Sequence, residues 1–166
     1  MYSRIFQISK YPIKQKEYFD TSRYDYGEHE GFVGEIADYV DNGNDRLSDI
    51  QWFKECYGTS LEFISKDKFK VIDKRNYFKG RVEAFFENIK ELQNVKEDDF
   101  IQGSKIPMLM CLTESIYRDR FDFYIDRDDT LKSGEYDEFF GPMDDFMRDA
   151  EEGEEYYIGN TIDYHY

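Results

Sequence analysis

The sequence is poor in the residues that build disulfide frameworks, metal sites and tight turns. Its 166 residues include two cysteines, two histidines, three prolines and one tryptophan. Cys56 and Cys111 are too few for a disulfide scaffold, and no cysteine or histidine spacing fits a structural zinc site. Both cysteines lie among apolar residues, so we expect buried free thiols. The sequence therefore predicts no metal site and no cofactor.

Long apolar runs are also missing. The longest extends from Ile106 to Leu112, whereas a membrane-spanning helix needs about 20 apolar residues. The first residues, Met1 to Ile5, lack the charged and then apolar pattern of a secretion signal. We therefore expect a cytoplasmic protein that makes no contact with a membrane.

Motifs that are typical of enzymes are absent as well. The sequence has no Gly-x-Ser-x-Gly elbow, no Walker-type loop and no dinucleotide-binding fingerprint. His165 lies one residue from the end of the sequence, which is a poor place for a catalytic base. We therefore expect a non-enzymatic protein. An acidic cleft that performs acid–base chemistry or binds a metal is the alternative, because 37 acidic side chains offer many carboxylate pairs.

Aromatic side chains are abundant. Phenylalanine and tyrosine occur 15 times each. One aromatic side chain can bury about 150–250 Å². A chain of this length can therefore build one core although 36% of its residues are charged. We expect a single domain over residues 1–166, with an α+β fold.

Acidic side chains are also abundant, and they are unevenly distributed. Residues 1–96 carry 16 basic and 17 acidic side chains and are near neutral. Residues 97–166 carry six basic and 20 acidic side chains, a formal charge of −14 out of the total of −15. A charge needed only for solubility has no reason to collect in one part of the chain. This asymmetry favours a cationic partner, and it disfavours direct binding to nucleic acid or to anionic membranes.

Hydrophobic periodicity predicts the elements of the near-neutral part. The clearest is a helix over residues 77–92, which we expect to lie across a small antiparallel sheet. Its apolar stripe consists of Phe78, Val82, Phe85, Phe86, Ile89 and Leu92. The other predicted elements are a strand over 4–9, a helix over 32–40, a helix over 49–57 after a Ser48–Gln51 capping box, and a hairpin of 61–65 with 69–72.

Shorter elements are predicted in the acidic part. They are a helix from Pro107 to about Ile116, a strand over 120–126, a polar connection over 127–141, a helix over 142–149 with Met143, Phe146 and Met147 inward, and a last strand or hairpin around Gly159-Asn160.

A possible calcium loop runs from Asp126 to Asp137. A calcium-binding loop needs glycine at its sixth position and a bidentate glutamate at its twelfth. Leu131 and Asp137 occupy these two positions here. An acidic turn without a bound metal is therefore the better interpretation.

The remaining candidate site is an acidic, tyrosine-rich surface over residues 122–157. Its carboxylates would attract a basic partner and mimic phosphates, and its tyrosines would supply contact area. The candidate partner-binding residues are Asp126, Asp128, Asp129, Glu135, Tyr136, Asp137, Glu138, Asp144, Asp145, Glu151, Glu152, Glu154, Glu155, Tyr156 and Tyr157.

The predicted function is that of a non-enzymatic inhibitor that occupies the basic site of a nucleic-acid-binding protein or a nuclease. DNA-mimic proteins that counter restriction or RNA-guided defence, and immunity proteins that cap basic toxins, use such surfaces. The likeness to both classes lies in charge and aromatic content only. A structural or assembly component is a further alternative, since solvated acids and half-buried tyrosines would account for the sequence about as well.

Overall fold

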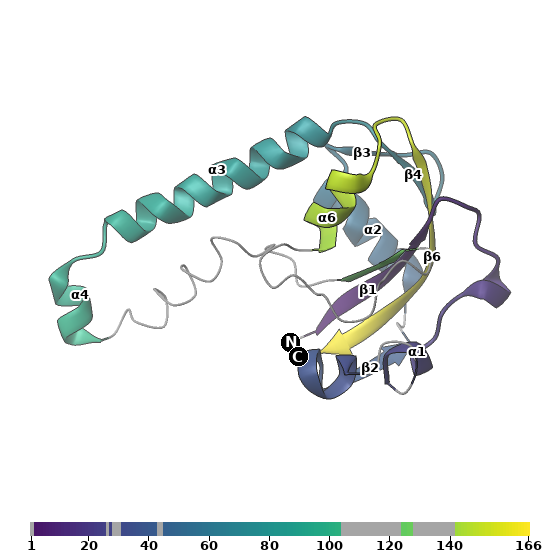
Figure 1. Cartoon of the computed structure of the whole chain (residues 1–166), viewed down its shortest axis with the longest axis horizontal. Coiled ribbons are helices and arrows are strands. Elements are labelled where there is room, and N and C mark those ends of the chain that lie inside the picture. Colours follow the sequence, from purple (N-terminus) through teal and green to yellow (C-terminus); the bar gives the residue numbers. More distant parts are fainter. Residues whose placement is uncertain (1, 26, 28–30, 43–44, 104–123, 128–141) are drawn as a thin grey trace.

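A six-stranded sheet organises the molecule (Figure 1). The computed structural model describes residues 2–25, 27, 31–42, 45–103, 124–127 and 142–166. The strands are β1 (Tyr2–Ser9), β2 (Tyr39–Asn42), β3 (Leu61–Phe63), β4 (Lys68–Val71), β5 (Tyr124–Arg127) and β6 (Glu155–His165). They follow the order β3-β4-β6-β1-β5, and β2 pairs with β6 beside this path. Every pair is antiparallel except β1 with β5. The predicted α+β class is confirmed.

Short and long helices surround this sheet. They are η1 (Gln15–Glu17), α1 (Ser22–Asp25), η2 (Phe32–Ile36), α2 (Arg46–Tyr57), α3 (Lys74–Gln93), α4 (Glu97–Gln102) and α6 (Pro142–Asp149). The bounds of α6 agree with the predicted helix, and Met143, Phe146 and Met147 are buried as expected. The predicted helix that was to begin at Pro107 lies outside the described residues, as do residues 120–123 of the predicted strand and most of the polar connection.

The sheet carries a hydrophobic cluster on each face, because successive side chains of a strand point to opposite sides. On one face, Phe6 of β1 packs against Phe53 of α2, and Phe69 of β4 packs against Phe146 of α6. We call this cluster the α2–α6 core. On the other face, Ile5 belongs to a smaller η2 core, whose members are Ile5, Phe19, Tyr24, Phe32, Ala37, Ile162 and Tyr164. The two faces are thus covered by α2 with α6 and by η1 to η2.

The predicted helix over residues 32–40 is wrong. Gly31 and Gly34 both have φ near 98°, in the region that favours glycine, so the chain forms only one irregular turn, η2. It then enters β2, which pairs with β6. The apolar residues that suggested a helix do mark buried positions, since Phe32 and Ala37 are both buried in the η2 core.

The last strand is continuous, and the predicted hairpin alternative does not occur. Between the pairs Phe6–Thr161 and Ile8–Ile158, β6 contains one residue more than β1, which makes a bulge rather than a turn. The amide oxygen of Gln7 accepts the backbone N–H of Asn160 at 3.1 Å.

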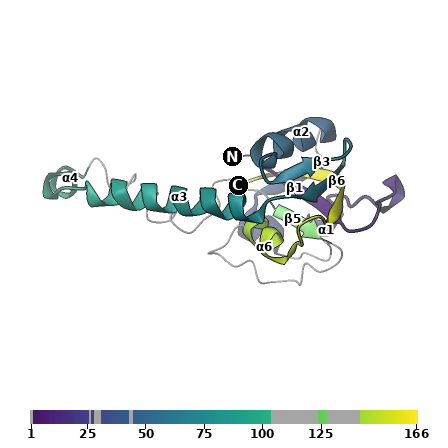
Figure 2. The same cartoon turned by 90° about the horizontal axis from the view of Figure 1, so that it is seen from above.

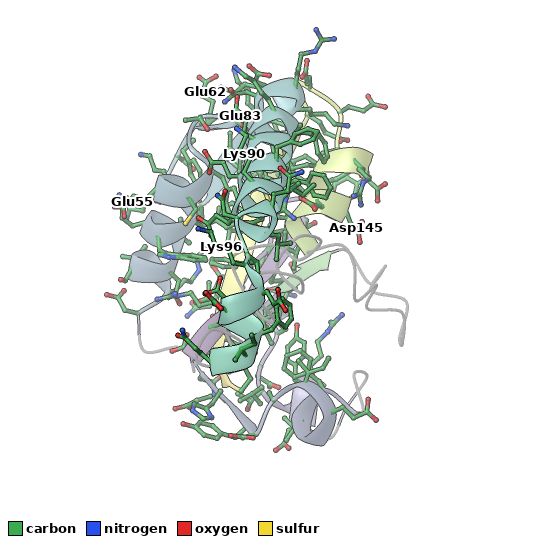
Figure 3. All side chains as sticks on the ribbon, turned by 90° about the vertical axis from the view of Figure 1, so that its left-hand side faces the viewer. Glu55, Glu62, Glu83, Lys90, Lys96 and Asp145 are labelled. Carbon is green, nitrogen blue, oxygen red and sulfur yellow. The ribbon has the colours of Figure 1, made fainter. Side chains whose placement is uncertain are left out.

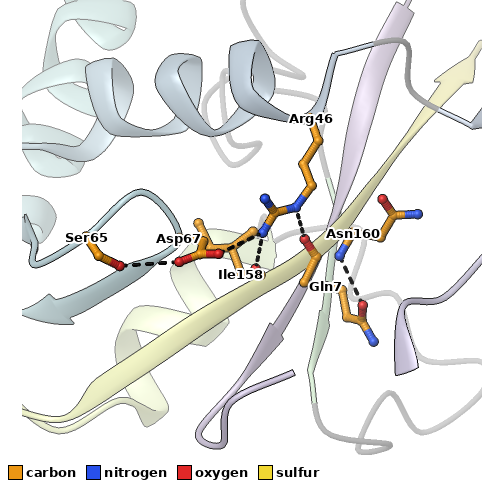
Figure 4. A network of polar contacts seen from close by, with 7 residues as sticks. Gln7, Arg46, Ser65, Asp67, Ile158 and Asn160 are labelled. Atoms are coloured by element: carbon orange, nitrogen blue, oxygen red, sulfur yellow. Dashed lines mark hydrogen bonds and ion pairs between the residues drawn. The ribbon is translucent and has the colours of Figure 1, made fainter. Parts of the chain in front are cut away.

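Arg46, the first residue of α2, ties this bulge to the helix (Figure 4). Its guanidinium donates to the backbone oxygens of Ile158, at 2.6 Å, and of Gly159, and it approaches Asp67 at 3.4 Å. The helix begins three residues earlier than predicted. Its cap is Asp45, whose carboxylate accepts the N–H groups of Leu47 and Ser48, so Ser48 is not the capping residue.

The predicted position of the long helix is also wrong. α3 contains no buried residue, and it extends away from the sheet instead of crossing it (Figures 1 and 2). α2 and α6, rather than α3, pack against the sheet in the α2–α6 core.

Candidate functional site: a helical arm

α3 and α4 form a helical arm that projects from the rest of the molecule, which we call the body (Figure 2). The arm begins at Asp73, whose carboxylate accepts the backbone N–H of Asn76 at 2.8 Å and so caps the helix. α3 has 20 residues, which corresponds to about 30 Å at the ordinary rise of 1.5 Å per residue. Gly103, with φ near 67°, ends α4.

The first two turns of α3 attach the arm to the body. The side chains of Tyr77 and Phe78 are half-buried against the α2–α6 core, and the ring of Tyr77 lies 6.2 Å from that of Tyr57. Arg81 forms an ion pair with Asp144 of α6 at 3.0 Å. Figure 3 views the arm end-on, with Glu55 of α2 and Asp145 of α6 on opposite sides of it. The arm therefore leaves the body between α2 and α6.

Beyond this root, part of the apolar side of the arm is exposed to solvent, while Phe85, Ile89 and Leu92 are half-buried. Val82 and Phe86 are 53% and 54% exposed, and Phe100 and Ile101 of α4 are 62% and 74% exposed. An amphipathic helix ordinarily buries its apolar stripe against the core. α3 has 20 residues and no fully buried side chain, so this helix departs from that rule among the described residues.

The arm is also polarised in charge. Residues 74–82 contain four basic side chains and no acidic one. Residues 83–99 contain six acidic and two basic side chains, a formal charge of −4. Glu83 and Lys90, labelled in Figure 3, are exposed members of this outer part. The arm thus combines an apolar stripe with a mainly acidic border.

The acidic residues predicted from the sequence do not form one described surface. Asp126 lies in β5, opposite Gln7 of β1. Six of the predicted residues lie outside the described part of the chain: Asp128, Asp129, Glu135, Tyr136, Asp137 and Glu138. The remaining eight lie on α6, on the turn after it and at the start of β6.

Two of these eight residues are buried, whereas the sequence interpretation placed them on an accessible surface. Asp144 is buried in α6, where Arg81 and Tyr77 of the arm contact its carboxylate. The side chain of Tyr156 is fully buried in the α2–α6 core, 4.9 Å from the ring of Phe146. The alternation along β6 turns Tyr156 inward and leaves Tyr157 half-exposed, which sequence alone did not distinguish.

The other six predicted residues are exposed or half-buried, and several contact cations or donors of the body. Asp145 pairs with Arg148 within α6. Glu155 pairs with Lys68 at 2.6 Å, and the Lys68 ammonium also lies over the ring of Tyr157. Glu152 accepts the backbone N–H of Lys74 at 3.0 Å, and the Glu151 side chain is exposed.

Glu154 is the most perturbed of these carboxylates. The ammonium of Lys10, 2.5 Å away, and then the hydroxyl of Tyr156 stabilise its charged form and lower its pKa to about 2. Stabilisation from this carboxylate is therefore present above its ordinary pKa of 4.5 and is lost as the pH falls through about 2. The pair of Glu154 with Lys10 thus links the residue before β6 to the residue after β1.

A second polar cluster lies where α2 meets the sheet. The buried carboxylate of Asp49 forms an ion pair with Arg4 and accepts the hydroxyl proton of Thr161 at 2.7 Å. Asp163 lies beside Arg4 in the sheet register. Burial, followed by the charge of Asp49, raises the pKa of Asp163. The contacts of this cluster are internal, and they link α2 to β1 and β6.

The described residues offer little for metal or membrane chemistry. No three of their His, Cys, Asp or Glu side chains are grouped as ligands of a metal ion. None of their helices has the length and apolar character needed to cross a bilayer. Cys56 is half-buried against the α2–α6 core, so the predicted burial of this thiol is met only in part, and Cys111 is outside the described residues.

The arm is the feature that sequence reasoning missed. The stripe from Phe78 to Leu92 was recognised, but periodicity shows only that a helix has an apolar side and does not say what covers that side. Comparison with known proteins adds no assignment, since no family model, curated protein or solved structure matches the chain.

Proposed function

We propose that this chain is a non-enzymatic binding protein that docks its helical arm, α3–α4, into an apolar groove of a basic partner protein. The observation that carries the proposal is the exposure of Val82 and Phe86 on a helix whose root is attached to the body. Recognition of an amphipathic helix in a groove uses apolar anchors at such spacings. Burial of each anchor would contribute about 1.5–3 kcal/mol.

The charge of the arm supports a basic partner. Its outer part, residues 83–99, carries −4, so a groove with lysine and arginine on its rim would be complementary to it. Nucleic-acid-binding proteins and nucleases present such cationic arrays. This partner class is the one expected from the sequence, and the proposal keeps it while moving the contact from residues 122–157 to the arm.

The test is retention of a basic protein from cell lysate on the immobilised chain, compared between variants. Val82→Gln with Phe86→Gln should reduce retention about a hundredfold, because both anchors are lost. Leu47→Gln is the matched control, since Leu47 is a 53% exposed apolar residue on α2. Equal retention by the arm variant, loss with Leu47→Gln, or unfolding of the arm variant would each overturn the proposal.

A pair of charge reversals tests where the acidic contact lies. Replacing Glu83, Glu87 and Glu91 with lysine should abolish retention of the partner at physiological salt, because the border of the arm becomes basic. Replacing Asp145 and Glu151 with lysine reverses the charge of two exposed acids of the C-terminal part. This variant should leave retention of the partner unchanged. The opposite pattern would return the contact to the acidic surface predicted from the sequence.

A further inference from the structure

One buried carboxylate makes several contacts with the root of the arm. Asp144 of α6 receives three hydrogen bonds from α3: Arg81 Nε donates to Oδ1 and Arg81 Nη2 to Oδ2, both at 3.0 Å, and the Tyr77 hydroxyl donates to Oδ1 at 2.6 Å. Tyr77 and Arg81 lie four residues apart and therefore on one side of the helix. The fork-to-fork arrangement of guanidinium and carboxylate fixes direction as well as distance.

A second contact joins the same two elements one turn earlier. The ammonium of Lys74 donates to the backbone oxygens of Arg148 and Ala150, at 2.7 and 2.6 Å, where α6 ends. The backbone N–H of Lys74 donates to Glu152 at 3.0 Å. Lys74 thus holds the first residue of α3, and Asp144 holds the turn that follows.

Beyond Arg81 no side chain of α3 is fully buried, and Phe85, Ile89 and Leu92 are half-buried. The 12 residues from Val82 to Gln93 extend about 18 Å, so a small rotation at the root becomes a large displacement at the tip. Lys74 fixes the first residue of α3, and Asp144 fixes the next turn beside the packed rings of Tyr77 and Phe78. Asp144 is the contact of this turn that constrains orientation as well as distance.

We infer that Asp144 is a latch that sets the direction of the helical arm, and so acts as a positioning residue for the binding proposed above. The effect on binding rests on that proposed function, whereas the effect on direction does not. Asp144 lies in the acidic part of the sequence and Arg81 in the near-neutral part. Asp144, one of the C-terminal acids, would therefore orient the arm rather than contact the partner directly.

Pulsed EPR distances between spin labels at Glu62 on the body and Glu91 on the arm test the latch, with Cys56 and Cys111 replaced by serine. Both labelled positions are exposed. Asp144→Asn keeps the shape of the side chain but loses its charge, and it should widen the distance distribution about twofold. Asp145→Asn is the matched control, because Asp145 pairs within α6 and should leave the distribution unchanged.

Tyr77→Phe provides a second, milder variant. It removes one of the three hydrogen bonds while the ring keeps its packing, so an intermediate widening is expected. An unchanged distribution in both variants, or equal widening in Asp145→Asn, would overturn the latch. Global unfolding of Asp144→Asn would also overturn it, because Asp144 would then support the body rather than only the arm.

Retention of the partner on the same variants separates the latch from the proposed function. A wide distribution with reduced retention supports both. A wide distribution with unchanged retention leaves the latch standing and contradicts binding through the arm. An unchanged distribution with reduced retention contradicts the latch and leaves the arm as the contact.

Discussion

At the scale of residues, two carboxylates of the acidic part form ion pairs with cations of the near-neutral part. Glu154 pairs with Lys10 at 2.5 Å, and Asp144 pairs with Arg81 at 3.0 Å. Each of these pairs joins the acidic part of the sequence to the near-neutral part. Exposed pairs contribute little to stability, typically below about 1 kcal/mol, whereas a buried acid that loses its partner costs several times more. The position of each acid therefore matters more than their number.

Asp163 is a carboxylate whose ionised form is disfavoured by its surroundings in the folded state. Its pKa is raised by burial and by the charge of Asp49, so the ionised form destabilises the folded state at neutral pH. Asp163→Asn should increase the free energy of unfolding at pH 7 by about 0.5–1 kcal/mol after allowance for solvent screening. The gain should shrink as the pH falls through the raised pKa of the folded state, and it should vanish below the unfolded-state pKa of 3.8, where Asp163 is protonated in both states.

Urea unfolding between pH 4 and pH 7 measures this effect. Glu151→Gln is the control, because it removes an exposed carboxylate from the turn after α6. A loss of stability in Asp163→Asn at pH 7 would show that the charge of Asp163 supports the fold.

At the scale of elements, two glycines have opposite roles. A Cβ on Gly159 would overlap the amide oxygen of Gln7 and lie 2.9 Å from Ile13 Cδ1, in the bulge of β6. Gly159→Ala should therefore cost about 1–3 kcal/mol. Gly80 lies within α3 with open space around it, so Gly80→Ala should stabilise the helix by about 0.5–1 kcal/mol. Denaturant unfolding of both variants checks the signs, and stabilisation by Gly159→Ala would contradict the bulge geometry.

Elements with a clear local signal could be predicted from the sequence. The hairpin of β3 with β4, the strand β1 and the helix α6 follow from apolar spacing and turn residues, and all three occur. Errors arose where tertiary pairing decided the outcome. Gly159 and Asn160 are typical turn residues, but pairing of β6 with three other strands keeps the chain extended through them.

At the scale of the whole molecule, the sequence predicted the class of fold but not the arm. Helix amphipathicity gave the extent of α3 to within a few residues, since the predicted span of 77–92 lies inside Lys74–Gln93. Its position depends on the polar contacts of Arg81 and Lys74 with α6, which periodicity does not contain. Likewise, net charge does not show which acids face solvent, so Asp144 was assigned to a surface although it is buried.

The most direct test of the arm is the free energy of unfolding of Val82→Gln with Phe86→Gln, measured in urea on the purified chain. If these side chains exist for a partner, the isolated protein should lose no more than about 0.5 kcal/mol, as is usual for exposed positions. A loss of about 3 kcal/mol or more, the cost of removing large side chains from a core, would show that the chain packs the stripe itself and would contradict the account.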